Sequence, residues 1–228
     1  MNRTLLLSAI LIPTFLMAAS FPDPPAEQLA PAGAKKATAV LAGGCYWGMQ
    51  GVFEHVKGVT ETQVGFSGGE KKTARYEVVE NGNTGHAESI QITYDPSVIT
   101  YGQLLKIYFS VAHDPTTLNR QHNDEGTQYR SEIFYGDENQ KNIAEQYIKI
   151  LDGAHVYKHP IVTKLEPVKG FYRAEEDHQH YLDQVQACGG RQTAQCADLN
   201  VGYIQAFDIP MLMALQKTYP DLYVKQIH

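Results

Sequence analysis

Apolar residues recur along the chain in short runs with two different spacings. Runs bounded by glycine or proline are typical of buried strands, and apolar residues three and four positions apart are typical of amphipathic helices. The predicted strands are 37–41, 62–66, 89–94, 131–135 and 161–165, and the predicted helices are 45–56, 100–111, 137–151 and a stretch from His178 onward. Strands that alternate with helices predict one α/β sandwich with a mixed sheet.

Two further stretches do not fit this alternation. Residues 114–127 are polar and irregular, and a loop of this length usually has a function. The last segment, 199–228, predicts a short amphipathic helix at 209–215 and contains no motif that assigns it a role.

The first 36 residues have a different pattern. In residues 1–20, Arg3 precedes an almost unbroken apolar run that ends in small side chains, which predicts the signal peptide of an exported protein, periplasmic or secreted. The apolar run is shorter than the about 20 residues of a membrane span, although an uncleaved anchor is the alternative. Residues 21–36 are rich in proline and alanine and predict a flexible linker.

Composition narrows the range of functions. Of the 228 residues, 43% are hydrophobic and 19% are charged, which is typical of a globular domain with its own core. The formal net charge of -6 provides no basic surface for nucleic acid or anionic lipid. The three cysteines form no Cys-x-x-Cys pair and His178-Gln-His180 is a weak ligand pair, so we expect no metal and no bound organic cofactor.

Cys45 is the first candidate for chemistry. It follows a predicted strand and Gly43-Gly44, and it begins a predicted helix. The positive end of a helix dipole stabilises a thiolate and lowers the cysteine pKa, which makes the thiol nucleophilic. We expect the glycines to let a substrate approach the backbone, and Tyr46 and Trp47 to form an aromatic wall for a small apolar or sulfonium-like group. A buried, inert cysteine beside core aromatics is the alternative.

The string Gly43-Gly-Cys-Tyr-Trp-Gly48 resembles the active-site signature of the A-type peptide methionine sulfoxide reductases. Further blocks that resemble this family follow in family order: Val64-Gly-Phe-Ser-Gly-Gly69, Tyr76-Glu77, Thr84-Gly-His-Ala-Glu88, His113-Asp-Pro-Thr116, Gly126-Thr-Gln-Tyr-Arg-Ser131, and Ala174-Glu-Glu with His178-Gln179 and Tyr181-Leu182. The resemblance covers roughly residues 37–182. It implies a two-layer sandwich with a ferredoxin-like core and an extended C-terminal tail, with the catalytic domain at 37–198.

By matching position, the resemblance implies that Cys45 is the nucleophile, Glu88 the acid, Tyr76 and Tyr129 the holders of the sulfoxide oxygen, and Asp124 the loop aspartate. A sulfoxide oxygen leaves poorly unless it is protonated, so the acid must stay neutral near pH 7. Desolvation among aromatics raises a carboxyl pKa in this way, and tyrosine hydroxyls can donate to the oxygen as charge develops. From residue type alone, the carboxylate could instead lie on the surface and the tyrosines in the core.

This chain departs from the family pattern at three positions near the inferred site. Tyr46 replaces the commoner Phe, Ser67 replaces Ala, and His122 replaces Gly before Asn123-Asp124. The hydroxyl of Tyr46 should leave the aromatic wall intact, and neither of the other two changes touches an inferred catalytic role.

Cys188 and Cys196 lie in a tail of glycine and small polar residues. The resemblance implies a relay in which Cys45 becomes a sulfenic acid, Cys188 attacks it, and Cys196 then forms a Cys188–Cys196 disulfide. An external dithiol, thioredoxin or a thioredoxin-like protein, would reduce that disulfide. In an oxidising compartment, a purely structural Cys188–Cys196 disulfide is the alternative. With either role of this disulfide, Cys45 is the thiol that is left over.

The expected substrate is the S epimer of methionine sulfoxide, in oxidised proteins or as the free amino acid. The expected protein is a monomer without membrane contact after signal cleavage. Two rival functions predict different sites. In a cysteine hydrolase or acyltransferase, His86, His113 or His178 would lie within hydrogen-bond reach of the Cys45 sulfur. In an exported binding or scaffold protein with a decayed signature, the cysteines would only cross-link and no thiol would be reactive.

Overall fold

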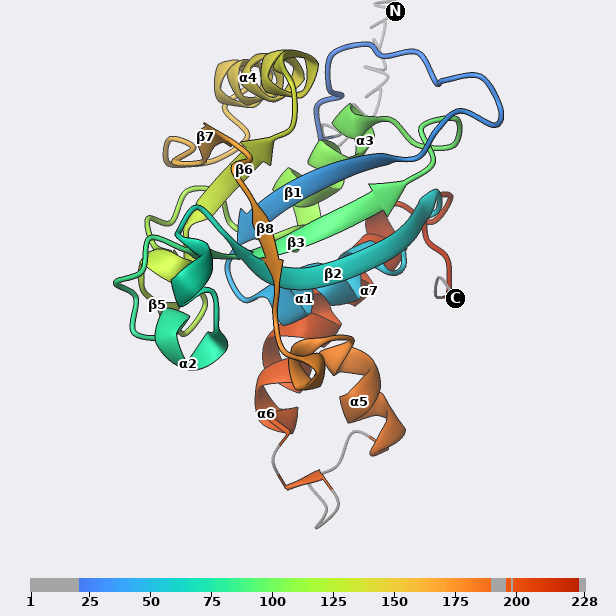
Figure 1. The fold of residues 1–228 in the computed structure, drawn as a ribbon. Helices are drawn as coiled ribbons and strands as arrows, with labels where there is room; N and C mark the ends of the chain where they lie inside the picture. The colour runs from blue at the N-terminus through green and yellow to red at the C-terminus, as the bar shows by residue number, and fades with distance from the viewer. Residues whose placement is uncertain (1–20, 190–195, 198, 226–228) are drawn as a thin grey trace, which may run out of the picture.

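A six-stranded mixed sheet runs through the molecule (Figure 1). The computed structural model describes residues 21–189, 196–197 and 199–225, so the predicted signal peptide, 1–20, lies outside the described residues. The strand order is β7-β6-β1-β3-β2-β8, and neighbours are antiparallel except for the parallel pair β6 and β7. These strands are β1 (Ala37–Gly43), β2 (Val59–Ser67), β3 (Ala87–Tyr94), β6 (Ser131–Tyr135), β7 (Lys164–Pro167) and β8 (Phe171–Arg173).

The centre of the sheet has the predicted ferredoxin-like connectivity. Strand β1, helix α1 (Tyr46–Phe53), strands β2 and β3, helix α3 (Tyr101–Ile107) and strand β6 follow one another as β-α-β-β-α-β. Strand β6 pairs with β1, and β3 lies between β1 and β2. The helices lie behind the sheet in the view of Figure 1. The predicted α/β sandwich with a mixed sheet is confirmed.

Shorter elements surround this centre. Helix α3 continues as a π-helical turn at Tyr108–Ala112, and a two-strand hairpin lies within the predicted loop 114–127. The remaining elements are α2 (Tyr76–Val79), the hairpin strands β4 (Arg120–Gln121) and β5 (Asp124–Glu125), α4 (Glu138–Gly153), α5 (Tyr181–Ala187), α6 (Val201–Tyr203) and α7 (Ile209–Thr218).

The core explains why β1 is apolar at successive positions. Ala39 and Leu41 point into the main core under the helices, while Val40 and Ala42 belong to a small cluster on the other face. Phe171 packs against that second cluster. A strand that is buried on both faces does not alternate between apolar and polar residues, so the sequence of β1 is apolar at successive positions.

Two predicted elements differ from the structure. The strand predicted at 161–165 lies at β7 instead, because pairing with β6 begins only where Lys164 faces Glu132. The helix predicted at 45–56 begins one residue later and ends at Phe53. The short elements α2 and β8 were not predicted, since neither is long enough to show a period.

The segment predicted as a flexible linker, 21–36, lies against the domain. The Lys106 ammonium lies 2.6 Å from the Asp23 carboxylate, and the Gly102 N–H donates to Glu27 at 2.6 Å. The Tyr147 hydroxyl donates to the backbone carbonyl of Pro22 at 2.8 Å. Composition did not reveal this packing because two acidic side chains and a carbonyl make the contacts.

The C-terminal segment is also part of the domain. Helix α7 packs against α1, and Leu215 is fully buried in the main core. The Val224 N–H donates to the His55 carbonyl at 2.8 Å, and the Lys57 N–H donates to the Leu222 carbonyl at 2.7 Å. These bonds fix the end of the described chain beside α1.

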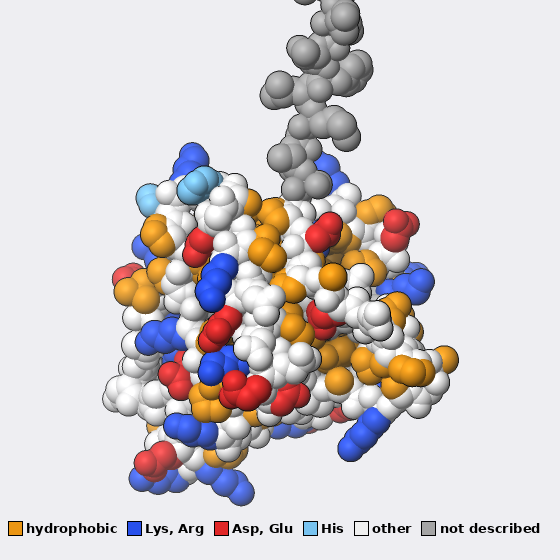
Figure 2. Space-filling view, turned by 90° about the horizontal axis from the view of Figure 1, so that it is seen from above, with side chains coloured by type: hydrophobic (Ala, Val, Ile, Leu, Met, Phe, Trp, Pro, Cys, Tyr) orange, Lys and Arg blue, Asp and Glu red, His pale blue; other side chains and the backbone are white. Residues whose placement is uncertain are grey.

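The surface carries charges of both signs. On the face drawn in Figure 2, Lys and Arg side chains are interspersed with Asp and Glu side chains, and apolar side chains lie between them. Within the described part of the chain, no helix combines the length and the apolar character needed to cross a membrane.

Candidate active site

Seven of the predicted site residues line one small cavity. Its volume is about 110 Å³, and Asn200 and Tyr203 complete the wall formed by Cys45, Tyr46, Trp47, Tyr76, Glu88, Asp124 and Tyr129. Pockets for drug-sized ligands begin at roughly 300 Å³, so this cavity has room only for the end of a side chain.

Cys45 is the N-cap residue of α1, one position before the first turn in which it was predicted, and its thiol is free. Gly44 before it has a left-handed φ of +92°, and a Cβ there would lie 2.3 Å from the side chain of Gln121. A Cβ on Gly43 would lie 2.8 Å from the His113 ring. The two glycines therefore leave room for the side chains of Gln121 and His113, and their expected role toward the substrate stays a prediction.

The pKa of Cys45 is raised well above its ordinary value, contrary to the expectation from its helix position. Burial is the largest cause, followed by the nearby carboxylates of Glu88, Asp208 and Asp124, whereas the backbone N–H of Trp47 lowers the pKa. Desolvation thus outweighs the helix terminus. The resting thiol is protonated, and a thiolate forms more readily when the surrounding carboxyls are neutral.

Glu88 is the neutral carboxyl that the chemistry requires. On β3 it shares the helix-facing side with Ile90, and it is only 3% exposed. One of its oxygens accepts a hydrogen bond from the Tyr46 N–H at 3.1 Å. Burial raises the pKa of Glu88 to about 8, although this hydrogen bond lowers it in part. At pH 7 the group is mostly protonated and can donate a proton into the cavity.

Two tyrosines reach the same cavity from separate elements. Tyr76 begins α2, and Tyr129 ends a 3₁₀ turn at Thr127–Tyr129. Burial and then the Glu88 carboxyl raise both pKa values, that of Tyr76 to about 12. Both hydroxyls therefore stay protonated at neutral pH and can donate hydrogen bonds.

The aromatic wall is more extensive than predicted. Trp47 stacks on Tyr181 with ring centroids 3.8 Å apart and 7° between the planes, and on His178 at 5.7 Å. Tyr46 is 1% exposed, and its hydroxyl lies 2.8 Å from Nδ1 of His178. The Tyr46 hydroxyl is thus hydrogen-bonded to His178, a residue that does not line the cavity.

None of the three histidines proposed as a base lines the cavity. His86 bonds to the backbone of Gly69 and Glu70, and Nε2 of His113 lies 2.8 Å from the Ser131 hydroxyl. His178 bonds to Tyr46. Among the described residues, the imidazole that a cysteine hydrolase needs beside its nucleophile is therefore missing.

Several neighbours of the site come from the segment 199–228, where sequence patterns indicated no role. Asn200 and Tyr203 line the cavity, and the Tyr203 hydroxyl donates to the Asp124 carboxylate. Asp208 is 3% exposed, its pKa is raised to about 8 by burial, and its Oδ2 has no hydrogen-bond partner among the described residues. No motif or period marks these positions, so they could not be found from sequence patterns.

Cys188 and Cys196 form a disulfide with each other. Cys188 is the C-cap residue of α5, and Cys196 is buried. The residues between them, 190–195, lie outside the described residues. This pairing is the one expected at the end of the predicted relay, with Cys45 left as a free thiol.

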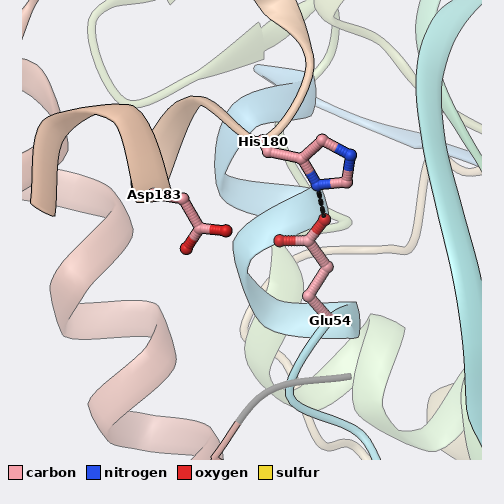
Figure 3. A group of neighbouring side chains, drawn as sticks. All are labelled: Glu54, His180 and Asp183. Atoms are coloured by element: carbon pink, nitrogen blue, oxygen red, sulfur yellow. Dashed lines mark hydrogen bonds and ion pairs between the residues drawn. The ribbon is translucent and has the colours of Figure 1, made fainter. Parts of the chain in front are cut away.

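Outside the cavity, one group of described side chains could hold a metal ion: Glu54, His180 and Asp183, whose donor atoms lie within 4.8 Å of one another (Figure 3). Glu54 is buried, and its Oε1 lies 2.5 Å from Nδ1 of His180 and 2.9 Å from the Thr62 hydroxyl. Because Glu54 closely follows α1 and His180 precedes α5, the pair links these two helices.

The cavity combines an oxidisable thiol with several proton donors, and the two other cysteines of the chain form a disulfide. These features define a thiol-dependent oxidoreductase. A family model described as peptide methionine sulfoxide reductase matches residues 37–201. The chain belongs to this family.

Individual relatives agree. The chain is 51% identical to peptide methionine sulfoxide reductase MsrA 2 of Mesorhizobium japonicum, over 82% of this chain and 89% of the relative. It is 43% identical to MsrA 2 of Synechocystis sp., over 80% and 79%. Among solved structures, reduced Mxr1 of Saccharomyces cerevisiae has a TM-score of 0.59 at 35% identity, over 69% of this chain and 88% of that one. Methionine sulfoxide reductase A of Corynebacterium diphtheriae has a TM-score of 0.57 at 34% identity, over 72% and 86%.

Proposed function

We propose that Cys45 reduces methionine sulfoxide by attacking the sulfoxide sulfur while Glu88 protonates the oxygen. The chain is an oxidoreductase of the MsrA type, and methionine sulfoxide reduction is its activity. The assignment of roles rests on one observation above all: a buried carboxyl with a pKa of about 8 shares a small cavity with the only free cysteine.

In the proposed reaction the Cys45 thiolate forms a bond to the sulfoxide sulfur, and the proton of Glu88 moves to the oxygen. The hydroxyl then passes to the Cys45 sulfur as the sulfur–oxygen bond of the substrate breaks. The bond between the two sulfurs breaks as well, and methionine leaves as the thioether with the electron pair of that bond. The proton lost by the thiol restores Glu88, so thiol and sulfoxide become sulfenic acid and thioether. Tyr76 and Tyr129 donate hydrogen bonds to the oxygen, and Trp47 contacts the methyl end of the substrate.

For recycling, the Cys188 thiol attacks the sulfenic acid and releases water, which leaves a Cys45–Cys188 disulfide. The Cys196 thiol then attacks Cys188, frees Cys45 and forms the Cys188–Cys196 disulfide. A thioredoxin-like dithiol reduces that disulfide and becomes oxidised itself. A Cys196→Ser variant should accumulate the Cys45–Cys188 disulfide during turnover, whereas a purely structural role of the pair would yield no such species in mass spectra.

The further proposals concern substrate and location. We expect the S epimer, in oxidised proteins or as free methionine sulfoxide, and a monomeric enzyme that is exported through the segment 1–20. N-terminal sequencing of the protein from the extracytoplasmic fraction should then begin near Phe21. Recovery of the full-length chain in membranes would instead indicate an anchor.

The direct test of the nucleophile is a single turnover. A Cys188→Ser/Cys196→Ser variant should release one methionine per chain and leave a sulfenic acid on Cys45 that dimedone labels. The additional change Cys45→Ser should abolish both signals. Methionine release without a label on Cys45 would contradict the proposed role.

A further inference from the structure

A segment near the end of the chain reaches the cavity from outside the family blocks. The family match ends at residue 201, and Tyr203 lies two positions beyond it. Tyr203 is nonetheless a wall residue of the cavity. It belongs to the helical turn formed by α6 and the π-helical residues Ile204–Asp208.

Tyr203 contacts two opposite parts of the site. Its hydroxyl donates to Oδ2 of Asp124, and its ring meets the Trp47 ring edge to face, with centroids 6.2 Å apart and 83° between the planes. One side chain therefore joins the loop carboxylate to the aromatic wall. The hydroxyl also lowers the pKa of Asp124, which burial raises.

The hairpin that carries Asp124 needs such support. Its strands β4 and β5 have two residues each, too few to be stable alone. His122 between them has a left-handed φ of +52°, which is unfavourable for a side chain with a Cβ. Phe207, one turn after Tyr203, stacks on the His122 ring at 4.5 Å and 19°. The same helical turn thus holds both His122 and Asp124.

The turn is itself fixed on α1. A Cβ on Gly48 would lie 2.4 Å from Cε of Met211 and 2.7 Å from a carboxylate oxygen of Asp208, so the glycine allows this close approach. Ile204 and Leu215 are fully buried. The turn is therefore a rigid support rather than a loose tail.

We propose that Tyr203 is a positioning residue that holds Asp124 in the active site and closes the substrate cavity beside Trp47. The C-terminal segment, for which the sequence indicated no role, thereby completes the site for the methyl sulfoxide end of an unbranched side chain. The inference rests on the proposed function, because it takes the cavity that Asp124 lines with Cys45 and Glu88 as the place where methionine sulfoxide is reduced.

The test begins with Tyr203→Phe, which keeps the ring and removes the hydroxyl. Loss of one hydrogen bond to a carboxylate predicts that kcat/KM for N-acetyl-methionine sulfoxide falls about tenfold, while the melting temperature falls by only a few degrees and the protein stays folded at the assay temperature. Tyr219→Phe is the matched control, because it removes a hydroxyl contact to Ser110 at 2.9 Å in the same segment, away from the cavity. That variant should retain wild-type kcat/KM.

A double-mutant cycle separates positioning from a general structural effect. If Tyr203 acts through Asp124, then Tyr203→Phe changes kcat/KM less than twofold in an Asp124→Ala background. Equal losses in both backgrounds, or wild-type kcat/KM in Tyr203→Phe, would overturn the inference alone. A wild-type protein that fails to reduce the sulfoxide in the same assay would overturn the proposed function and this inference together.

Discussion

Replacing Glu88 with Gln tests the proton donor that the proposed reaction requires. Glutamine has nearly the same shape, and its amide oxygen can still accept the hydrogen bond from the Tyr46 N–H. It cannot release a proton to the sulfoxide oxygen. General acid catalysis usually contributes about 10²- to 10⁴-fold, so the single-turnover rate at pH 7 should fall by about that factor.

The pH dependence of the single-turnover rate gives a more specific prediction for Glu88. With a pKa of about 8, Glu88 is about 90% protonated at pH 7 and about 10% protonated at pH 9. The neutral form is the active one, so its advantage is lost as the pH rises through 8. The Glu88 carboxylate raises the Cys45 pKa, but the reactive form of wild type has a neutral Glu88, so Cys45 ionises in that form as it does in Glu88→Gln. The ratio of the two rates isolates Glu88 and should fall about tenfold between pH 7 and pH 9.

The assay is rapid-quench measurement of methionine released by reduced protein in a single turnover at each pH. Two results would contradict the role of Glu88 as the proton donor. One is a Glu88→Gln rate close to wild type at pH 7. The other is a rate ratio that stays constant from pH 7 to pH 9, which would mean that another group supplies the proton.

Three further predictions follow from the same geometry. Asp208→Asn removes a carboxylate that raises the Cys45 pKa and that ionises near pH 8. Iodoacetamide should therefore alkylate Cys45 faster than in wild type above pH 8 and at the same rate at pH 7. Equal rates at every pH would exclude this coupling. His180→Ala removes the imidazole partner of the buried Glu54 carboxylate. Because His180 is half exposed, the free energy of unfolding in urea should fall by only about 1 kcal/mol. The same change should cause no further loss in a Glu54→Gln background. Dialysis against EDTA should leave kcat unchanged, since residues of the chain supply the proposed proton donors; loss of activity restored by a divalent cation would contradict this.

Much of the fold could be predicted because its central elements have strong local signals. β1 and β6 are short runs that are buried on both faces, and α3 has a capping box and buries one face in the core. The short elements could not be predicted in the same way. β8 has three residues and exists because it pairs with β2, a contact between positions about a hundred residues apart.

The same distinction between local signals and long-range packing applies to the active site. Its predicted members were found through local motifs, such as the cysteine after two glycines and the block that ends in Glu88. Tyr203 and Asp208 reach the site only because α7 packs on α1, which no local pattern encodes. The direction of the Cys45 pKa shift was also predicted wrongly, since helix position is visible in a sequence whereas desolvation by distant segments is not.

We expect Cys45 to reduce methionine sulfoxide in this cavity. The most direct test is to incubate racemic N-acetyl-methionine sulfoxide and dithiothreitol with the wild-type protein or Cys45→Ser, and to resolve the epimers on a chiral column. We predict that wild type converts one epimer, the S form, into N-acetyl-methionine and that the variant converts neither. Persistence of both epimers with wild type, or unchanged conversion by Cys45→Ser, would contradict the account.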